Sequence, residues 1–341
     1  MNHLIGKKVT KDIINTYGVT VIPANTVIND ESIRLLKSHR IDPDSIFIDH
    51  SIQMTTNVDS KVLVQNTVSY TKELFESVKR SRKIPLIEIR KEVVPAIQEI
   101  SRNTDVFRLF ELVKAKDDYT YQHNIGVGVL STLIGRWMDL SEKELALLTL
   151  SATMHDIGKV KIPDEILNKP GKLTSEEYEL VKKHAIYGYE MLKETTGISH
   201  RVALVALQHH EREDGRGYPF GLHKDKIDLF SSIVAVADIF HAMSSKRPYH
   251  DPISFHEIIT QMVQGKFGDL NPKIVSIFLE NVIKKMIGKQ VVLTDGRVGE
   301  VVYLNPLEVN SPLIKIGDGF IDLSQEKEIR IQEILVDLEL F

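Results

Sequence analysis

Cysteine is missing from this sequence of 341 residues. Its absence excludes disulfide bonds, catalytic thiolates, and zinc or iron–sulfur centres held by cysteine. It also leaves no argument for an oxidising compartment. A metal bound by this chain must therefore use His, Asp or Glu side chains.

The sequence also lacks a long apolar run and an excess of charge of one sign. No stretch reaches the roughly 18 apolar residues of a membrane-spanning helix, and the N-terminus MNHLIGKKVTKDII has no long apolar core. Lys and Arg total 43 against 47 Asp and Glu, which gives a net charge of −4. This balance argues against binding of a nucleic-acid polymer or an anionic membrane by the chain as a whole. We therefore expect a cytoplasmic protein in which any phosphate binding is local.

The composition is that of a folded chain, with 42% hydrophobic and 26% charged residues. The length suggests two or three domains, and the expected fold class is mainly α. Changes in the residue pattern along the chain predict a small α+β module at 1–60, connecting helices at 61–103, a helical bundle domain at 104–286 and a small antiparallel β-barrel at 287–341.

Turn residues and apolar periodicity support the two N-terminal segments. Short β-like runs occupy Val19–Ile22 and Ser45–Ile48, and a helix is predicted over residues 30–37 between them. Apolar stripes through residues 60–103 favour packing in a core, although a partner helix or a dimer seam would give the same pattern.

Cap and hairpin signals support the two C-terminal segments. Capping boxes, Ser141-x-x-Glu144 and Thr174-x-x-Glu177, open two of the predicted helices. After residue 288 β-branched residues alternate with Gly and Asp, and Asp295-Gly296 predicts a hairpin.

Histidines and aspartates gather on the apolar faces or at the ends of predicted helices in the 104–286 segment. His123 shares a helix face with Val127, Leu130 and Ile134, so its side chain should point inward. Asp238 lies in the apolar helix SSIVAVADIFHAM, where an unpaired carboxylate would be costly. The whole group comprises His123, His155, Asp156, His184, His209, His210 and Asp238.

Each of these residues alone has an ordinary alternative, because a single inward histidine is more often a hydrogen-bonded core residue. As structural residues, however, the whole group would need an improbable number of separate hydrogen-bond partners. Neutral imidazoles and carboxylates are good ligands for iron, manganese, nickel or zinc. We therefore expect the group to bind metal.

The number of ligands favours two ions about 3.5–4 Å apart, because the group exceeds the roughly six positions of one octahedral ion. One expected lobe is His123, His155, Asp156 and Asp238, and the other is His184, His209 and His210 with Asp156 shared. A hydroxide bridging the two metals would be the nucleophile of a hydrolytic site. Lys159 follows closely and is either a phosphate or leaving-group contact or a solvated surface lysine.

Five segments of the chain together resemble the HD-GYP domain, a subgroup of the HD phosphohydrolases that hydrolyses cyclic di-GMP. They are HNIGVGVLSTLIGRW at 123, ATMHDIGKVKIPDEILNKPGKLT at 152, HAIYGYEML at 184, HHEREDGRGYPFGL at 209 and VADIFHAMSSKRPY at 236. The similarity covers roughly residues 104–285, and the run HHExxDGxGYP is highly specific. The resemblance implies an HD-type helical bundle, and the flanking modules resemble, more loosely, those of Gram-positive bacterial proteins.

The resemblance also implies roles for individual residues. It implies metal ligation by the same seven side chains, with Asp156 and Lys159 in catalysis. Arg247 would hold the dinucleotide or is an ordinary surface charge, and the GYP loop either contacts substrate or only shapes a turn. The implied substrate-binding residues are Lys159, Asp214, Gly217, Tyr218, Pro219, Arg247 and His250.

Three positions depart from the family pattern. Members with three metals carry a Glu where this chain has Tyr119, so we expect two metals. His250 replaces a Lys of many relatives, which puts substrate affinity or preference in doubt because His is only partly charged at neutral pH. His241 replaces a usual Asp and either supports a metal ligand or is merely tolerated.

The sequence therefore predicts a phosphodiesterase that opens cyclic di-GMP to pGpG, with slower conversion to GMP left open. Its cofactors would be two divalent metal ions, with iron or manganese favoured and zinc or nickel as alternatives. A second hypothesis is a catalytically weak receptor that binds cyclic di-GMP and signals to a partner. A third is an HD hydrolase of mononucleotides or of another cyclic dinucleotide. A homodimer formed through the helices before residue 104 is a further hypothesis.

Overall fold

The computed structural model describes residues 8–15, 20–22, 26, 28, 30–39, 41, 48–49, 60–103, 105–114, 119–245, 253, 255–266, 268–304, 311–326 and 328–336. The chain forms two compact units, Met1–Val58 and Asp59–Phe341. None of the described helices has both the length and the apolar character that crossing a bilayer requires.

The first unit combines two short antiparallel ladders with one helix. β1 (Lys8–Val9) pairs with β4 (Ile48–Asp49), and β2 (Ile13–Ile14) pairs with β3 (Thr20–Ile22). The helix predicted over residues 30–37 is confirmed as α1 (Asp30–Ser38). Of the run predicted to end at Ile48, residues 45–47 lie outside the described residues. The small core consists of Val9, Ile13, Ile22, Ile28, Ile33, Leu36 and Ile41.

The second unit is mainly helical, as the sequence predicts. Its first helices are α2 (Ser60–Ser81), α3 (Leu86–Glu88), the π-helix η3 (Ile89–Val93), α4 (Val94–Ile100), α5 (Val106–Val113), α6 (Tyr119–Trp137) and α7 (Glu142–Met154). The next are the 3₁₀ helix η4 (Ile157–Lys161), α8 (Asp164–Leu167), α9 (Ser175–Lys182), α10 (His184–Lys193) and α11 (His200–Gln208). The last are the 3₁₀ helix η5 (Lys224–Lys226), α12 (Leu229–Ser244), α13 (Phe255–Val263) and α14 (Pro272–Lys284).

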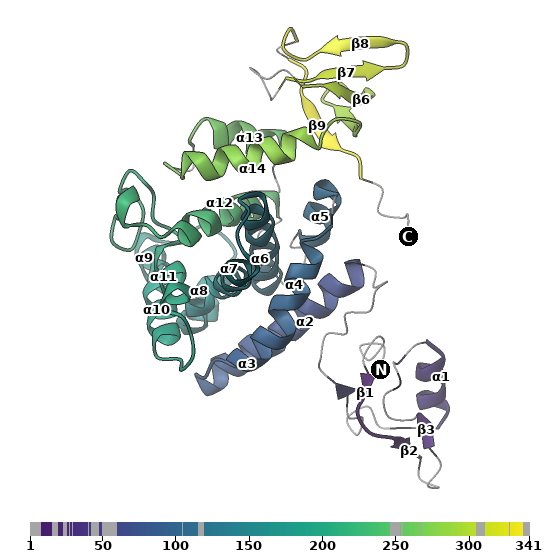
Figure 1. Ribbon diagram of the computed structural model, residues 1–341, viewed down its shortest axis with the longest axis vertical. Coiled ribbons are helices and arrows are strands. Elements are labelled where there is room, and N and C mark those ends of the chain that lie inside the picture. The colour runs from purple at the N-terminus through teal and green to yellow at the C-terminus, as the bar shows by residue number, and fades with distance from the viewer. Residues whose placement is uncertain are drawn as a thin grey trace. The chain divides into compact units, whose positions relative to one another are not determined.

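Helix α6 is central to this bundle, because it contacts α2, α4, α5, α7, α12 and α14 (Figure 1). The aromatic rings of Phe110, Phe240 and Phe278 pack together, with centroids 4.6 Å apart for the first two and 5.0 Å apart for the last two. These rings come from α5, α12 and α14, so the core ties together segments that are distant in sequence.

The apolar stripes of residues 60–103 are largely buried, which confirms the prediction of core packing for most of their length. Val64, Val78 and Ile97 are buried, whereas Val62 and Ile87 are exposed. Helix α2 contacts α4, α5 and α6, so the buried stripe faces the bundle itself.

Both predicted capping boxes are present. Ser141 and Glu144 close reciprocal bonds at the start of α7, and Thr174 and Glu177 do so at the start of α9. These bonds satisfy backbone N–H groups that a helix start leaves without a partner within the helix.

The second unit ends in an antiparallel sheet with strand order β8-β7-β6-β5-β9. The predicted hairpin is confirmed, since Gly296 adopts φ +85 between two paired strands. In this order β8 and β9 are the edges, and no pairing among the described residues joins them. The sheet is therefore present, but its closure into a barrel is not shown. The strands are β5 (Gln290–Leu293), β6 (Val298–Tyr303), β7 (Leu313–Ile316), β8 (Gly319–Asp322) and β9 (Ile331–Ile334).

Candidate metal centre

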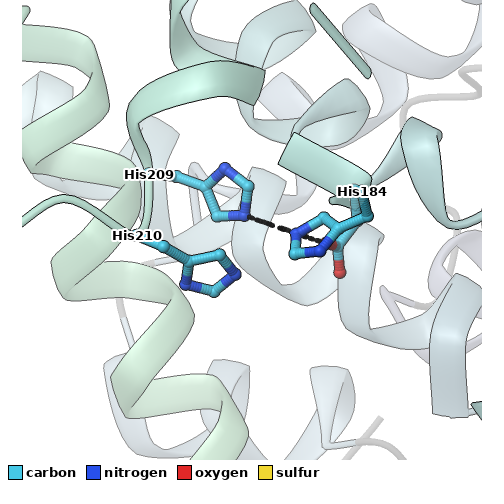
Figure 2. A group of neighbouring side chains, drawn as sticks. His184, His209 and His210 are labelled. Carbon is cyan, nitrogen blue, oxygen red and sulfur yellow. Dashed lines mark hydrogen bonds and ion pairs between the residues drawn. The ribbon is translucent and has the colours of Figure 1, made fainter. Parts of the chain in front are cut away.

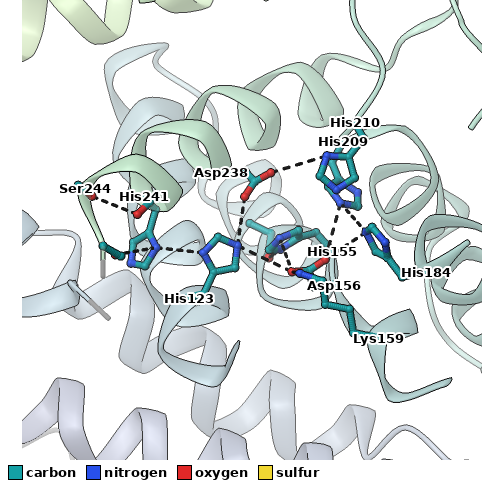
Figure 3. Close-up of polar contacts among 12 residues, drawn as sticks. His123, His155, Asp156, Lys159, His184, His209, His210, Asp238, His241 and Ser244 are labelled. Carbon is teal, nitrogen blue, oxygen red and sulfur yellow. Dashed lines mark hydrogen bonds and ion pairs between the residues drawn. The ribbon is translucent and has the colours of Figure 1, made fainter. Parts of the chain in front are cut away.

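The structure brings together all seven side chains of the histidine–aspartate group, although they come from five parts of the chain (Figures 2 and 3). Their candidate ligand atoms form two subsets, and within each subset the atoms lie within 4.8 Å of one another. The first subset is His123, His155 and Asp238, and the second is Asp156, His184, His209 and His210.

Helix ends place most of these side chains. His155 and Asp156 follow the last residue of α7, and His209 and His210 follow the last residue of α11. His184 is the first residue of α10, and only Lys183 separates it from the end of α9. The two exceptions are the side chains in helix interiors, His123 in α6 and Asp238 in α12.

Three of the histidines are oriented by backbone carbonyls at helix ends. The Nδ1–H of His155 donates to the carbonyl of Ala152 (2.7 Å), and the Nδ1–H of His184 donates to the carbonyl of Val181 (2.6 Å). The Nδ1–H of His209 donates likewise to the carbonyl of Ala206 (2.9 Å). Carbonyls in the last turn of a helix lack an intrahelical partner, so they are available as acceptors. The bond to Nδ1 leaves the lone pair of Nε2 for a ligand.

Asp156 lies between the two subsets. Its Oδ1 is 3.3 Å from Nε2 of His184 and 3.8 Å from Nε2 of His209. Its Oδ2 is 3.4 Å from Nε2 of His155 and 3.8 Å from Nε2 of His123. The two oxygens of one carboxylate therefore face opposite halves of the cluster.

Asp238 joins the same two halves from the other side. Its Oδ1 lies 3.1 Å from Nε2 of His123, and its Oδ2 lies 3.9 Å from Nδ1 of His210. Figure 3 shows both contacts, with the carboxylate directed from α12 toward the histidine rings.

Gly158 allows η4 to approach α10 closely. A Cβ at this position would lie 1.9 Å from the carbonyl oxygen of His184 and 2.4 Å from the backbone N of Gly188. Any side chain would therefore separate the two elements. Because Asp156 immediately precedes η4, this close packing also sets the distance between Asp156 and His184.

Burial keeps most of the histidines neutral. It lowers the pKa of His123 to about 4 and that of His184 to about 4, despite the nearby carboxylates. Burial also lowers the pKa of His209 and of His210 well below the ordinary value. For His155 burial acts in the same direction, but the adjacent Asp156 carboxylate outweighs it and raises the pKa.

The two carboxylates remain charged. Burial alone would raise the pKa of Asp156, but the charges of Lys159 and His155 lower it well below the ordinary value. Burial likewise opposes ionisation of Asp238, but its close contact with Nε2 of His123 lowers the pKa of Asp238 well below its usual range. Neutral imidazoles and ionised carboxylates are the protonation states that metal binding requires.

The cluster fits metal ions on its own polar atoms. Nε2 of His155 and Oδ1 of Asp156 are buried and have no hydrogen-bond partner among the described residues. A buried polar atom without a partner carries a desolvation cost that a bound ion would remove. His and Asp are also suitable ligands for divalent transition metals.

Lys159 lies at the edge of this cluster. Its Nζ donates to Oδ2 of Asp156, three residues earlier, and its side chain is 23% exposed. The sequence left Lys159 as either a phosphate or leaving-group contact or a solvated surface lysine. An ion pair with a buried carboxylate is not expected of a freely solvated lysine. The ammonium group therefore contacts the cluster while the side chain stays partly exposed to solvent.

The loop with the GYP sequence borders the same cluster. The ring of Tyr218 stacks on His210, with centroids 4.5 Å apart, and the Tyr218–Pro219 bond is cis. Gly217 is packed so closely that a Cβ would lie 2.5 Å from the carbonyl oxygen of His210. Asp214 accepts a hydrogen bond from the backbone N of Arg216 (2.9 Å), which stabilises the turn before this loop.

Glu211 is a residue of the site that the sequence analysis did not single out. It is 2% exposed, and its carboxylate accepts hydrogen bonds from the backbone N–H groups of Phe220 and Leu222, both at 2.8 Å. It thereby anchors the loop beside the cluster. The available signal was its position in HHE, where a carboxylate directly follows two inward-facing histidines.

Several residues named in the sequence analysis are not placed. Arg247 and His250, both expected to bind substrate, lie outside the described residues. Tyr119 begins α6, but its side chain is not among those described.

Comparison with known proteins agrees with the sequence resemblance. Residues 108–270 match a family described as "HD domain". The chain is 36% identical over 226 residues to "Cyclic di-GMP phosphodiesterase PA4108" of Pseudomonas aeruginosa, covering 66% of this chain and 53% of that protein. It is 40% identical over 181 residues to "Cyclic di-GMP phosphodiesterase" of Thermotoga maritima, covering 51% of this chain and 49% of that protein. The chain thus spans about half the length of these relatives.

A solved structure shares the fold. Bd1817, described as a HDG"Y"P protein from Bdellovibrio bacteriovorus, superposes with a TM-score of 0.56 over 83% of this chain and 97% of that chain. At 18% identity the likeness concerns the fold alone.

Proposed function

We propose that this chain, whose residues 108–270 match the HD-domain family and carry the HD-GYP sequence motifs, is a metal-dependent phosphodiesterase that hydrolyses cyclic di-GMP to linear pGpG. The observation that carries the proposal is the convergence of seven His and Asp side chains into one buried cluster. The names of the two relatives, both cyclic di-GMP phosphodiesterases, support the choice of substrate.

The proposed cofactors are two divalent metal ions, one in each subset of the cluster. His123, His155 and Asp238 would hold one ion and His184, His209 and His210 the other, with Asp156 bridging them. When bound, such ions supply Lewis-acid stabilisation of phosphoryl oxygens and lower the pKa of bound water. We favour iron or manganese over zinc or nickel.

The protein's own groups would bind and orient the phosphodiester. The Lys159 ammonium, held at the edge of the cluster by Asp156, neutralises charge on a phosphate there and stabilises the departing oxygen. The loop around Tyr218, fixed by Glu211 and packed on His210, forms a wall of the site. Asp214, Arg247 and His250 are proposed substrate contacts on the basis of the sequence.

The test is a substrate panel on metal-loaded protein prepared without oxygen. Cyclic di-GMP, cyclic GMP-AMP, cyclic di-AMP and mononucleotides compete in one reaction, and products are separated by chromatography. We expect pGpG from cyclic di-GMP as the leading product, with GMP appearing later. Saturable binding of cyclic di-GMP without product would indicate a receptor instead, and preference for another substrate would correct the specificity.

We further propose four features of the protein on the basis of its sequence. These are cytoplasmic location, a homodimer formed through the helices before residue 104, a signalling protein partner, and closure of the C-terminal sheet into a barrel module. The four-segment division of the chain belongs with them. Light scattering tests the dimer, because a mass of one chain would reject it.

A further inference from the structure

His241 is a buried imidazole that contacts the cluster without belonging to it. It lies in α12 and is 1% exposed. Its Nδ1 is 3.0 Å from Nδ1 of His123 (Figure 3). Its Nε2 is 2.9 Å from the carbonyl oxygen of Val113 at the end of α5. The ring therefore bridges a backbone carbonyl and a candidate metal ligand.

The contact with Val113 determines which ring nitrogen of His241 carries a proton. A carbonyl oxygen only accepts, so Nε2 of His241 carries the proton that it donates to Val113. In the neutral ring Nδ1 then has a lone pair and accepts from Nδ1–H of His123. A second proton on His241 would place a charge on a ring buried from solvent, which is unfavourable. Nε2 of His123 lies 3.1 Å from Oδ1 of Asp238, so this carboxylate favours a proton on Nε2. His241 opposes it by accepting from Nδ1–H, which leaves the Nε2 lone pair that a metal ion would need.

His123 has a structural need for such a partner. His155, His184 and His209 lie at helix ends and donate Nδ1–H to carbonyls in the preceding turn. His123 lies inside α6, where carbonyls serve the bonds of the helix itself. His241 instead links His123 by hydrogen bonds to the carbonyl of Val113, which again lies at a helix end.

Gly126 shows that the space for His241 is built into α6. A Cβ at residue 126 would lie 2.0 Å from Nε2 and 2.2 Å from Cδ2 of His241. Glycine in a helix interior costs about 1 kcal/mol relative to alanine. Its presence is explained here by the imidazole that packs against it.

We infer that His241 is a positioning residue that locks His123 in the tautomer required for metal binding, through the chain Val113 carbonyl–His241–His123. The inference deepens the proposed function and rests on its metal site. Of the two interpretations of His241 that the sequence left open, these contacts favour support of a metal ligand over mere tolerance of His at this position. Partners of this kind that orient metal-bound histidines typically change metal affinity 10–100-fold when removed.

A matched pair of variants separates this role from simple packing. In His241→Asn the side-chain oxygen is bonded to Cγ as Nδ1 is in histidine, so it can accept from His123. His241→Leu has the same branching without an acceptor. We expect the Leu variant to bind one metal about 10–100-fold more weakly, and the Asn variant to bind it nearly as tightly as the parent. Affinity is measured by competition with a chelator, and melting curves monitor folding.

A third variant reaches the same contact from the other side. Gly126→Ala should displace the His241 ring and weaken metal binding as the Leu variant does. Alanine has a higher helix propensity than glycine. A loss of metal affinity in this variant could therefore not be attributed to a weakened α6.

The proton itself provides a readout that needs neither metal nor activity. Long-range proton–nitrogen NMR correlations of metal-free protein labelled with ¹⁵N-histidine report which ring nitrogen carries hydrogen, and a His123→Gln variant assigns the signal. We expect Nδ1–H on His123 in the parent and in His241→Asn, and loss of that preference in His241→Leu.

Three results would overturn the inference: Nε2–H on His123 in the parent, equal losses of metal affinity in the Asn and Leu variants, or unchanged affinity in the Leu variant. Failure of the proposed function would look different, as a parent protein that binds no metal or turns over no cyclic dinucleotide. The tautomer measured in metal-free protein decides the inference in that case too.

Discussion

The backbone of Gly158 lies against that of His184, so that a Cβ at residue 158 would meet the His184 carbonyl oxygen at 1.9 Å. This contact places the element that follows Asp156 directly on the helix that presents His184. The candidate bridging carboxylate is thus positioned by a close backbone approach as well as by its own ion pairs.

Replacing Gly158 by Ala should therefore damage both stability and the metal site. The added methyl forces η4 away from α10, and overpacking of this kind costs about 1–3 kcal/mol. Urea unfolding and metal content per chain check the prediction. Gly188→Ala is the matched control on the opposite element, because its Cβ would be 3.3 Å from its nearest neighbours and should be tolerated better. Equal behaviour of the two variants would contradict the prediction.

Glu211→Gln should loosen the loop that carries Tyr218. Both carboxylate oxygens accept backbone N–H bonds, and an amide would place its NH₂ group against one of them. We expect a loss of about 1–3 kcal/mol, faster hydrogen exchange in residues 217–222, and a higher KM for cyclic di-GMP.

Glu213→Gln provides the control for that change. One oxygen of Glu213 accepts from the side chain of Asn271 at 2.7 Å, and a glutamine oxygen can do the same. If exchange in residues 217–222 were as slow in the Glu211 variant as in this control, Glu211 would not be the anchor of the loop.

Stability of the metal-free protein should fall on acidification below about pH 6.5. His123 and His184 have pKa values of about 4 in the folded state, so the unfolded chain binds more protons between these limits. Each such histidine contributes up to about 1.4 kcal/mol per pH unit. The raised pKa of His155 has the opposite effect on stability. Its contribution to folding is present below about pH 6.5 and is lost as the pH rises through the pKa of His155 in the folded state.

Urea midpoints between pH 4.5 and 8, with a chelator present, measure this profile. The prediction is a maximum near pH 6.5 and a shallower acid limb in a His184→Gln variant. A stability that is constant or increasing toward pH 5 would refute the assignment of neutral buried histidines.

Lys159→Met should reduce turnover while leaving metal content unchanged. Removing one group that stabilises charge in a transition state commonly costs 10²–10³ in kcat. Lys161→Met is the matched control in the same 3₁₀ turn, because its Nζ pairs with Glu190 at 3.8 Å. Similar rates for the two variants, or loss of metal only in the Lys159 variant, would argue against a role for Lys159 at the substrate.

The sequence could predict the elements and the members of the cluster because both follow from local patterns. Inward positions on helix faces identified His123 and Asp238, and the capping boxes at Ser141 and Thr174 marked helix starts that the structure confirms. The hairpin at Asp295-Gly296 was equally visible.

What the sequence could not predict depends on contacts between distant segments. The close approach of Gly158 to His184 follows from packing of η4 on α10, and the hydrogen bond between His123 and His241 joins α6 to α12. Glu211 was overlooked because the groups that it binds are backbone N–H groups, which leave no signature in side-chain identity. Closure of the C-terminal sheet likewise depends on pairing between its edges, which alternation alone does not specify.

We propose that one cluster, shared through Asp156, binds two metals and opens cyclic di-GMP. The most direct measurement titrates metal-free protein with manganese or ferrous iron in the absence of oxygen, following metal per chain and pGpG formed in the same samples. We predict that turnover appears as the second equivalent of metal binds and is absent from Asp156→Ala. Full turnover at one metal per chain, activity in the Asp156 variant, or two bound metals with no cyclic dinucleotide opened would contradict it.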